Sequence, residues 1–214
     1  MKLIGMLDSP YVRRVAISLQ LMGLPFEHRS VSVFRGMKDF SAINPVIKAP
    51  TLVCDDGEIL MDSSLILDYA EALAAPERRL MPPRLPERQH ALHRIGLALA
   101  LGEKAVQIVY ERGLRPPEKQ HEPWLDRVAM QMHAAARLLD DAVGRHPFDS
   151  AHIDQAGITT AVVWTFVQQA LPQSLDAAAF PALGAWCDQA EHLPAFRAAP
   201  HGEAPMDPAA CQPV

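Results

Sequence analysis

Hydrophobic positions in the first third of the chain alternate between short runs and helical stripes. Lys2–Met6 is a short apolar run that predicts a strand, and in Pro10–Met22 apolar residues recur every three or four positions, which predicts a helix. Phe26–Val33 alternates loosely and predicts a second strand. Because the helix between them has about the length of a βαβ crossover, we expect the two strands to be parallel.

A hairpin and a further helix follow an irregular stretch, Phe34–Pro50. Thr51–Cys54 and Glu58–Met61 are apolar runs separated by Asp-Asp-Gly, which favours a tight turn and therefore an antiparallel pair. From Asp62 onward, polar residues that can cap a helix precede an apolar stripe that extends to Leu73. These elements predict a small α/β domain over residues 1–75.

The pattern changes after residue 75. Residues 76–88 contain four prolines and four arginines with few apolar residues, which is typical of a linker. Beyond it the apolar positions follow a helical period, and short connections predict a helical bundle over residues 89–200. Residues 201–214 show no period and are predicted to be a loosely held tail. The helices of the bundle are expected at residues 89–113, 124–143, 153–171 and 182–192.

Composition narrows the class of protein. The chain of 214 residues has a formal net charge of −5 and 21% charged residues, so no basic surface for nucleic acid is indicated. Its apolar stretches are too short or too interrupted to span a bilayer, so no membrane partner is expected. Cys54, Cys187 and Cys211 are widely spaced, which suggests neither a disulfide framework nor a zinc knuckle and fits a reducing cytoplasm.

Nine histidines raise the question of a metal site. His90 and His93 lie on one face of a predicted helix, but no third ligand follows at metal-site spacing. We therefore expect ordinary solvated histidines and no bound metal.

Two helix starts carry polar side chains of interest. Ser9 precedes Pro10, an arrangement that starts a helix because the hydroxyl can accept from free backbone N–H groups and proline needs no partner at the first position. Asp62 and Ser63 stand in the same way before the helix that follows the hairpin. From the residues alone both sites are helix caps, and Pro50 is an ordinary proline at the entry of a strand.

Three segments give the chain a resemblance to the cytosolic glutathione transferases. "SPYVRRVAISLQLMGLPFE" resembles the first helix and turn of that superfamily, "NPVIKAPTLVCDDGEILMDSSLILDYAE" its glutathione-binding segment, and "FPALGAWCDQAEHLPAFRAAP" its C-terminal helix. The resemblance implies a thioredoxin-like N-terminal domain of the α/β class, with the order βαβ-α-ββα, followed by an all-α helical-bundle domain. It is closest in kind to bacterial, serine-type members.

The resemblance implies a glutathione site, position by position. Ala49 and Pro50 match a step whose proline is cis and whose preceding residue binds the cysteinyl part of glutathione through its backbone. Asp62 and Ser63 match the acidic-serine pair that binds the γ-glutamyl end, where a hydroxyl with free N–H groups suits a carboxylate and Asp62 suits an α-ammonium. Lys48 matches a position near the glycyl carboxylate that is often basic or polar, although a solvated lysine fits nearly as well.

Ser9 matches the serine that holds the glutathione sulfur as a thiolate. A free thiol has a pKa of about 8.5, and lowering it by about two units needs roughly 2.7 kcal/mol. A hydrogen bond to a charged group gives roughly 1.5–3 kcal/mol and a helix N-terminus roughly 0.3–1 kcal/mol, so the two suffice together. Asp8 would oppose the thiolate if its carboxylate pointed toward the sulfur.

The resemblance implies an enzyme that activates glutathione, its co-substrate, for attack on a small electrophile. A glutathione-dependent peroxidase or isomerase, and a non-catalytic binding module on the same fold, are the alternatives. A thiol–disulfide oxidoreductase is disfavoured because Ser9 replaces the reactive cysteine. A cytoplasmic homodimer with a role in detoxification is expected.

The second-substrate pocket is the least defined part of this picture. Tyr11 and Tyr110 are candidates for it, and Trp124 could border it. At helical spacing, however, Tyr110 and Trp124 are more typical of core or bundle residues.

Overall fold

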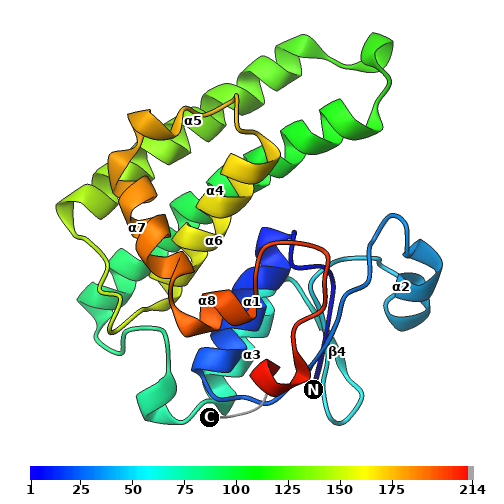
Figure 1. Ribbon diagram of the computed structural model, residues 1–214, viewed down its shortest axis with the longest axis vertical. Helices are drawn as coiled ribbons and strands as arrows, with labels where there is room; N and C mark the ends of the chain where they lie inside the picture. Colours follow the sequence, from blue (N-terminus) through cyan, green and yellow to red (C-terminus); the bar gives the residue numbers. More distant parts are fainter. Residues whose placement is uncertain (212–214) are drawn as a thin grey trace. The chain divides into compact units, whose positions relative to one another are not determined.

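A computed structural model describes residues 1–211, which form two compact units (Figure 1). The first unit contains residues 1–81 together with the chain from His192 onward. The second unit contains Pro82–Glu191. The chain therefore leaves the first unit once and returns to it at its C-terminal end.

The first unit is built on a mixed sheet of four strands within the described residues, in the order β2-β1-β3-β4. β1 (Lys2–Ile4) and β2 (Glu27–Arg29) are parallel, with Leu3 opposite His28. β1 is antiparallel to β3 (Thr51–Val53), which is antiparallel to β4 (Ile59–Met61). The predicted parallel pair and the predicted hairpin are both confirmed.

Helices of the first unit pack against this sheet and against each other. α1 (Pro10–Leu21) contacts β1 and α3 (Ser63–Leu73), and α3 contacts β4. Leu3, Val15 and Ile66 are fully buried, which places the core between the sheet and these two helices. The unit also contains η1 (Pro76–Arg78), α8 (Pro194–Ala198) and η4 (Pro208–Cys211).

A short helix, α2 (Met37–Ile43), lies inside the stretch whose pattern was irregular. Only Phe40 of this helix is buried, and Gly36 at its start makes no side-chain cap, so neither a stripe nor a cap marks it in the sequence. Its presence gives the order βαβ-α-ββα. The implied thioredoxin-like α/β domain followed by a helical region is confirmed.

The second unit is a helical bundle. α4 (Leu85–Leu114) contacts α5 (Glu122–Arg145) and α6 (Gln155–Ala170), and α7 (Pro181–Glu191) contacts α5 and α6. Short turns η2 (Pro117–Lys119) and η3 (Ala177–Ala179) lie between helices. The predicted helices are confirmed, and α4 begins earlier than expected, inside the predicted linker, because Pro86 is compatible with the first turn of a helix.

The apolar helix α6 is central to the bundle. Asp154 caps it, since its Oδ1 accepts from the N–H of Gly157 at 2.7 Å. Trp186 of α7 packs over Gly157 and donates its Nε1–H to the Gly157 carbonyl at 2.9 Å. A Cβ at Gly157 would lie 3.0 Å from the Trp186 ring, so the small residue allows the two helices to approach closely.

The C-terminal part of the chain is fastened to the first unit. The Nε–H of Arg13 donates to the carbonyl of Ala199 at 2.7 Å, and the same guanidinium lies over the ring of Phe196 at 5.6 Å. Met206 and Cys211 are buried. This division differs from the predicted one, in which residues 89–200 form the helical domain and residues 201–214 a loose tail. Residues 212–214 lie outside the described part of the chain.

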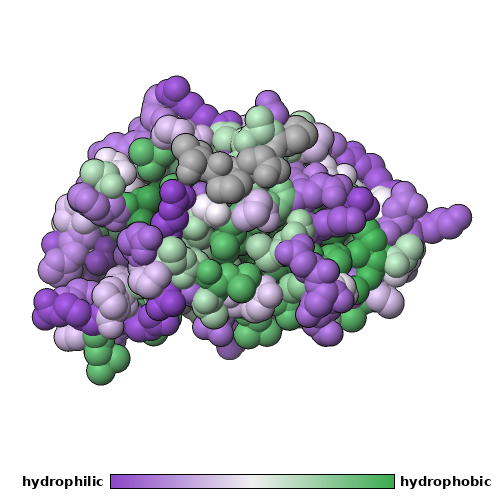
Figure 2. Space-filling view, turned by 90° about the horizontal axis from the view of Figure 1, so that it is seen from below, coloured by the Kyte–Doolittle hydropathy of each residue, from purple (hydrophilic) through white to green (hydrophobic). Residues whose placement is uncertain are grey.

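The surface carries a mixture of apolar and polar side chains, as the face in Figure 2 shows. On α3, Leu65, Tyr69 and Leu73 follow one another at intervals of four residues and are 65%, 37% and 46% exposed. They leave one apolar stripe of the helix uncovered in the single chain. Among residues 1–211, no helix is both long enough and apolar enough to cross a membrane.

Candidate functional site

Ser9 ends a tight turn and begins α1. Its N–H donates to the carbonyl of Met6 at 3.2 Å, and its Oγ accepts from the N–H of Val12 at 3.4 Å. Ser9 is thus the N-cap, as predicted, with Pro10 in the first turn. Because the hydroxyl accepts the cap hydrogen bond through a lone pair, its own proton can still be donated to a ligand.

The loop that enters β3 lies next to this turn. Its Ala49–Pro50 peptide bond is cis, as the resemblance implies. Gly5, whose φ is +136°, separates β1 from the Ser9 turn, and a Cβ there would lie 2.6 Å from Val12 and 3.2 Å from Ala49. Only glycine fits between them, so the first turn of α1 and the cis-proline loop come close together around Gly5.

Two polar side chains that sequence reasoning missed brace the same loop. The Nδ2–H of Asn44 donates to Oγ1 of Thr51 at 2.8 Å, and that hydroxyl donates to the carbonyl of Lys48 at 2.7 Å. Asn44 Oδ1 also accepts from the N–H of Val46 at 3.0 Å. Asn44 and Thr51 are both buried, whereas the side chain of Lys48 is exposed to solvent. The loop conformation is therefore fixed from beneath, with Lys48 on its outer side.

The start of α3 places Asp62 and Ser63 as a pair. Asp62 caps the helix, since its Oδ1 accepts from the N–H of Ser64 at 2.9 Å. Its φ of +73° lies in the left-handed region, which costs a residue other than glycine roughly 1–3 kcal/mol, although Asp tolerates it better than most. Ser63, which follows it, is buried and 4% exposed.

Arg14 of α1 joins α1 to the start of α3. Its Nη1–H groups donate to Oγ of Ser63 at 3.1 Å and to Oγ of Ser64 at 3.3 Å. Burial lowers the pKa of Arg14 to about 10, while Asp62 and Tyr11 oppose that shift, so the guanidinium stays charged at neutral pH. Its buried Nε has no hydrogen-bond partner among the described residues. The site therefore contains a buried positive charge directly behind Ser63.

Sequence reasoning did not single out Arg14, but a signal for it exists. Arg13 and Arg14 are adjacent in a helix whose other residues from Val12 to Leu19 are almost all apolar, and both arginines are buried. A charge inside a fully buried stretch of helix must meet polar partners in the fold. Arg13 meets the Ala199 carbonyl, and Arg14 meets the two serines.

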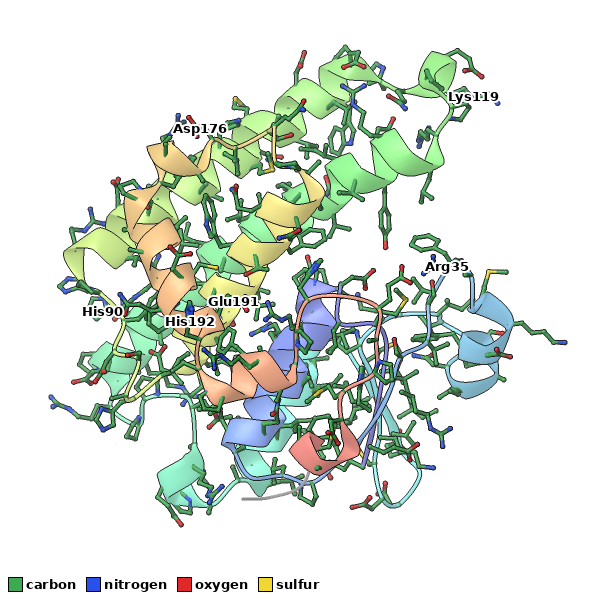
Figure 3. The ribbon with its side chains drawn as sticks, in the orientation of Figure 1. Arg35, His90, Lys119, Asp176, Glu191 and His192 are labelled. Carbon is green, nitrogen blue, oxygen red and sulfur yellow. The ribbon has the colours of Figure 1, made fainter. Side chains whose placement is uncertain are left out.

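Asp8 is half-buried beside Ser9, and burial raises the pKa of its carboxyl. His201, the Ser9 backbone N–H and Arg35 oppose that shift, whereas Glu203 adds to it. Figure 3 places Arg35 on the loop that precedes α2. The carboxyl next to Ser9 is thus surrounded by charges from that loop and from the C-terminal segment.

Of the two tyrosines assigned to the second-substrate pocket, Tyr11 belongs to the first turn of α1 and Tyr110 to the second unit. Tyr110 and Trp124 lie on helices of the bundle, as expected, but each is 44% exposed, so neither is a core residue. The reason for Tyr110 is its phase on α4. Ile108 is buried, and a residue two positions further points to roughly the opposite side of a helix.

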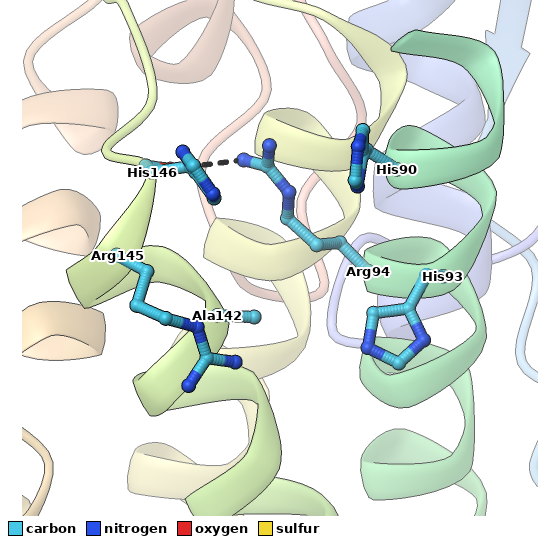
Figure 4. Close-up of a pocket in the computed structure, with 6 residues that line it drawn as sticks. All are labelled: His90, His93, Arg94, Ala142, Arg145 and His146. Carbon is cyan, nitrogen blue, oxygen red and sulfur yellow. Dashed lines mark hydrogen bonds between the residues drawn. The ribbon is translucent and has the colours of Figure 1, made fainter. Parts of the chain in front are cut away.

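A basic pocket of about 230 Å³ lies in the second unit between the first turns of α4 and the end of α5 (Figure 4). Arg94 is held there by a hydrogen bond from Nη1 to the carbonyl of His146 at 3.1 Å, and its guanidinium lies over Phe148 at 4.7 Å. Within residues 1–211 no group of three or more His, Cys, Asp or Glu residues is arranged to hold a metal. The remaining residues that line the pocket are His90, His93, Ala142 and Arg145.

Comparison with known proteins finds similarity to proteins described as glutathione S-transferases or as GST-like. Residues 3–78 match the family model described as the N-terminal domain of glutathione S-transferase. The chain is 27% identical over 197 residues to the "Uncharacterized GST-like protein YibF" of Escherichia coli K12, with 90% of each chain covered.

Two solved structures extend the likeness to the whole fold. A glutathione transferase family member from Pseudomonas fluorescens Pf-5 with bound glutathione is 28% identical, with a TM-score of 0.81, and covers 92% of this chain and 97% of its own. A glutathione S-transferase from Methylobacterium radiotolerans in complex with glutathione sulfonate is 26% identical, with a TM-score of 0.85, and covers 96% and 97%.

Proposed function

Because the chain belongs to the cytosolic glutathione S-transferase superfamily, we propose that it is a glutathione transferase. In this proposal the first unit binds glutathione, Ser9 stabilises the glutathione sulfur as a thiolate, and the thiolate attacks a small electrophile. The thiol proton leaves to solvent, a carbon–sulfur bond forms, and any leaving group departs from the carbon attacked. A cytoplasmic setting and a role in detoxification follow from this proposal.

The pair Asp62–Ser63 carries the proposal. Asp62 has a positive φ, and the buried Ser63 accepts a hydrogen bond from the buried Arg14. A helix cap alone does not need this arrangement, which costs free energy. The arrangement suits an α-amino acid end, because Asp62 can meet an ammonium while the Ser63 hydroxyl and the first N–H groups of α3 meet the carboxylate. The positive charge of Arg14 favours the carboxylate further.

The other proposed contacts cover the rest of glutathione. The backbone of Ala49, before cis Pro50, would hold the cysteinyl part, and Lys48 would face the glycyl carboxylate. Ser9 would donate its hydroxyl proton to the sulfur, at a helix N-terminus where negative charge is favoured. Tyr11 and Tyr110 stay proposed as parts of the pocket for the electrophile.

Retention on immobilised glutathione, followed by elution with free glutathione, tests the binding step. A panel of aryl halides, activated alkenes, organic peroxides and isomerisable substrates, with loss of glutathione as the readout, then separates conjugation from the alternatives. Peroxide-dependent oxidation of glutathione without conjugate would favour the peroxidase. Binding without turnover of any class would favour the non-catalytic module.

A homodimer is part of the proposal. The uncovered stripe of Leu65, Tyr69 and Leu73 on α3 supports it, since exposed apolar rows are typical of interfaces. Light scattering at micromolar concentration should give about twice the 23.5 kDa of the single chain. A stable mass of one chain would refute the dimer while leaving the glutathione site untouched.

A further inference from the structure

His28 is a buried histidine whose two ring nitrogens are both used by the backbone. It lies on β2 and is 9% exposed. Nε2 is 2.8 Å from the carbonyl of Gly5, and Nδ1 is 3.0 Å from the N–H of Met206. Because a carbonyl only accepts and an amide N–H only donates, Nε2 must carry the proton and Nδ1 the lone pair. The contacts therefore fix the neutral ring in one tautomer.

The first of these contacts reaches the candidate site. The carbonyl of Gly5 belongs to the peptide that enters the Met6–Ser9 turn, and Gly5 is packed against Val12 and Ala49. A shift of this peptide would displace both the N-cap serine and the cis-proline loop. His28 holds it from the side of β2.

The second contact reaches the C-terminal segment, residues 201–211. The hydroxyl of Ser30 donates to the carbonyl of Glu203 at 2.5 Å, and the Glu203 carboxylate pairs with Arg35 at 2.5 Å. Further along, the carbonyl of Cys211 accepts from the N–H of Phe26 at 3.1 Å. Figure 1 shows this segment, in red, returning alongside the strands toward the N-terminus. Hydrogen bonds therefore hold the segment at Glu203 and at Cys211, on either side of Met206, which contacts His28.

The same segment sets the charges around Asp8. His201 and Glu203 act on the Asp8 carboxyl in opposite directions, and Arg35, the partner of Glu203, acts on it as well. Release of the segment would remove His201 and Glu203 from the neighbourhood of Asp8. The field at the position proposed for the glutathione sulfur would then change.

We propose that His28 is a positioning residue for the Ser9 end of the site, and that residues 201–211 complete that end while the ring of His28 is neutral. The part of this inference that concerns glutathione rests on the proposed function. A proton on Nδ1 would set an N–H against the N–H of Met206 and break that contact, so acid releases the segment.

The pH direction follows from the burial of His28. Burial lowers the pKa of the ring, and the Gly5 carbonyl opposes this shift. A histidine with a lowered folded-state pKa stabilises the closed arrangement above its ordinary value of about 6.5, and that stability is lost as the pH falls through the folded pKa.

Charged and titratable groups on the elements around His28 are engaged elsewhere. Glu27 pairs with Arg29 at 2.7 Å and lies 4.0 Å from Lys2. The carboxylate of Asp207 accepts from the N–H of Ala209 at 2.9 Å. The thiol of Cys211 donates to the carbonyl of Asp207 at 3.6 Å. Burial raises the pKa of this thiol, which the backbone N–H of His28 opposes, so the thiol is neutral near pH 7.

Two variants separate the hydrogen bonds of His28 from its titration. In His28→Gln the amide can donate to Gly5 and accept from Met206, but it does not titrate. In His28→Leu both contacts are lost. His152→Gln is the matched control, because His152 is an exposed histidine of the second unit paired with Asp149.

The first readout is amide exchange of residues 203–211, measured at pH 7.5 and 5.5 and corrected for intrinsic rates. Protection in the parent and in the control variant His152→Gln should fall on acidification, by up to about tenfold for the titration of one histidine. His28→Gln should stay protected at both pH values. If protection in the parent does not change with pH, or if His28→Gln loses protection in acid as the parent does, His28 does not control the release of residues 201–211. This comparison stands even if His28→Leu fails to fold.

The second readout is the thiol titration of bound glutathione, followed by ultraviolet thiolate absorbance. His28→Leu should raise the pKa of the bound thiol by about half a unit to one unit. His28→Gln should restore the parent value. If glutathione binds but its thiol has the same pKa in the parent, His28→Leu and His28→Gln, His28 has no positioning role. If glutathione does not bind at all, the proposed function fails, while amide exchange still shows whether His28 controls the release of residues 201–211.

Discussion

The two ends of the candidate site are built in different ways. At the start of α3, Ser63 is buried against the charged guanidinium of Arg14. At the start of α1, Ser9 is only half-buried and accepts a single long hydrogen bond at 3.4 Å from Val12. The first end is suited to holding a charged ligand group tightly, and the second leaves a hydroxyl proton to donate. Under the proposed function, affinity and ionisation of the thiol are therefore separable.

The largest expected effect is on Arg14, which links the two helix starts. Arg14→Met keeps the length of the side chain but removes a charge and the hydrogen bonds to Ser63 and Ser64. Glutathione affinity should fall by about 2–3 kcal/mol, roughly 30- to 150-fold, as measured by calorimetric titration. Arg13→Met is the matched control, because Arg13 is an equally buried arginine directed at Ala199, and it should retain affinity within about threefold. Equal losses in the two variants would remove any special role for Arg14.

Ser9→Ala sharpens the comparison from the other end. The variant should keep most glutathione affinity while the pKa of the bound thiol rises by about one to two units, a change of roughly 1.4–2.7 kcal/mol. The rate optimum should shift to higher pH by the same amount. Thiolate absorbance against pH measures the effect directly. Loss of the cap costs about 1 kcal/mol of stability, so thermal unfolding is followed alongside. An unchanged titration would leave Ser9 a helix cap.

Ser63→Ala should show the reverse pattern. One hydroxyl contact to the ligand carboxylate is lost while the N–H groups of α3 remain, so affinity should fall by roughly 1–2 kcal/mol, or about 5- to 30-fold. Asp62→Asn should weaken the same end. The pKa of the bound thiol should not move in either variant. Exposed Ser64→Ala, which loses a weaker contact to Arg14 at 3.3 Å, is the control. If binding by both Ser63→Ala and Asp62→Asn matches the parent, the γ-glutamyl assignment is wrong.

Lys48→Ala should have the smallest effect. The side chain is exposed, and a solvent-screened pair contributes less than about 1 kcal/mol, so affinity should fall about two- to fivefold at low salt. The difference from the parent should disappear as salt is raised. A salt-independent loss would mean that Lys48 acts on the loop held by Asn44 and Thr51 rather than on the ligand.

Local patterns predicted most of the fold. The Ser9-Pro10 start and the Asp-Asp-Gly turn each carry their signal within a few residues, and the structure has both. α2 carries no such signal, because its seven residues bury only Phe40. The returning C-terminal segment could not be read from its own composition. Its contacts are backbone groups that meet partners far away in the chain, and such contacts leave no period.

The candidate site divides in the same way. Pairs of neighbouring residues, such as Ala49–Pro50 and Asp62–Ser63, were found through resemblance because their motifs are continuous. Arg14 and Asn44 were missed since each acts on a residue in another element. His28 is similar, because its role depends on a tautomer that two distant backbone groups select. The sequence of a segment predicts its local structure and the polar groups that it carries, whereas the fold determines which residues those groups contact.

The hydrogen bond between Phe26 and Cys211 has a consequence for solubility. β2 is an outer strand, and Glu27 donates inward to the carbonyl of Met1, so the neighbouring N–H of Phe26 faces the open edge. Unpaired edges are templates on which strands of other molecules add, and aggregation starts there. Because the carbonyl of Cys211 accepts from this amide, a strand of another molecule cannot pair with it, which disfavours aggregation at this edge.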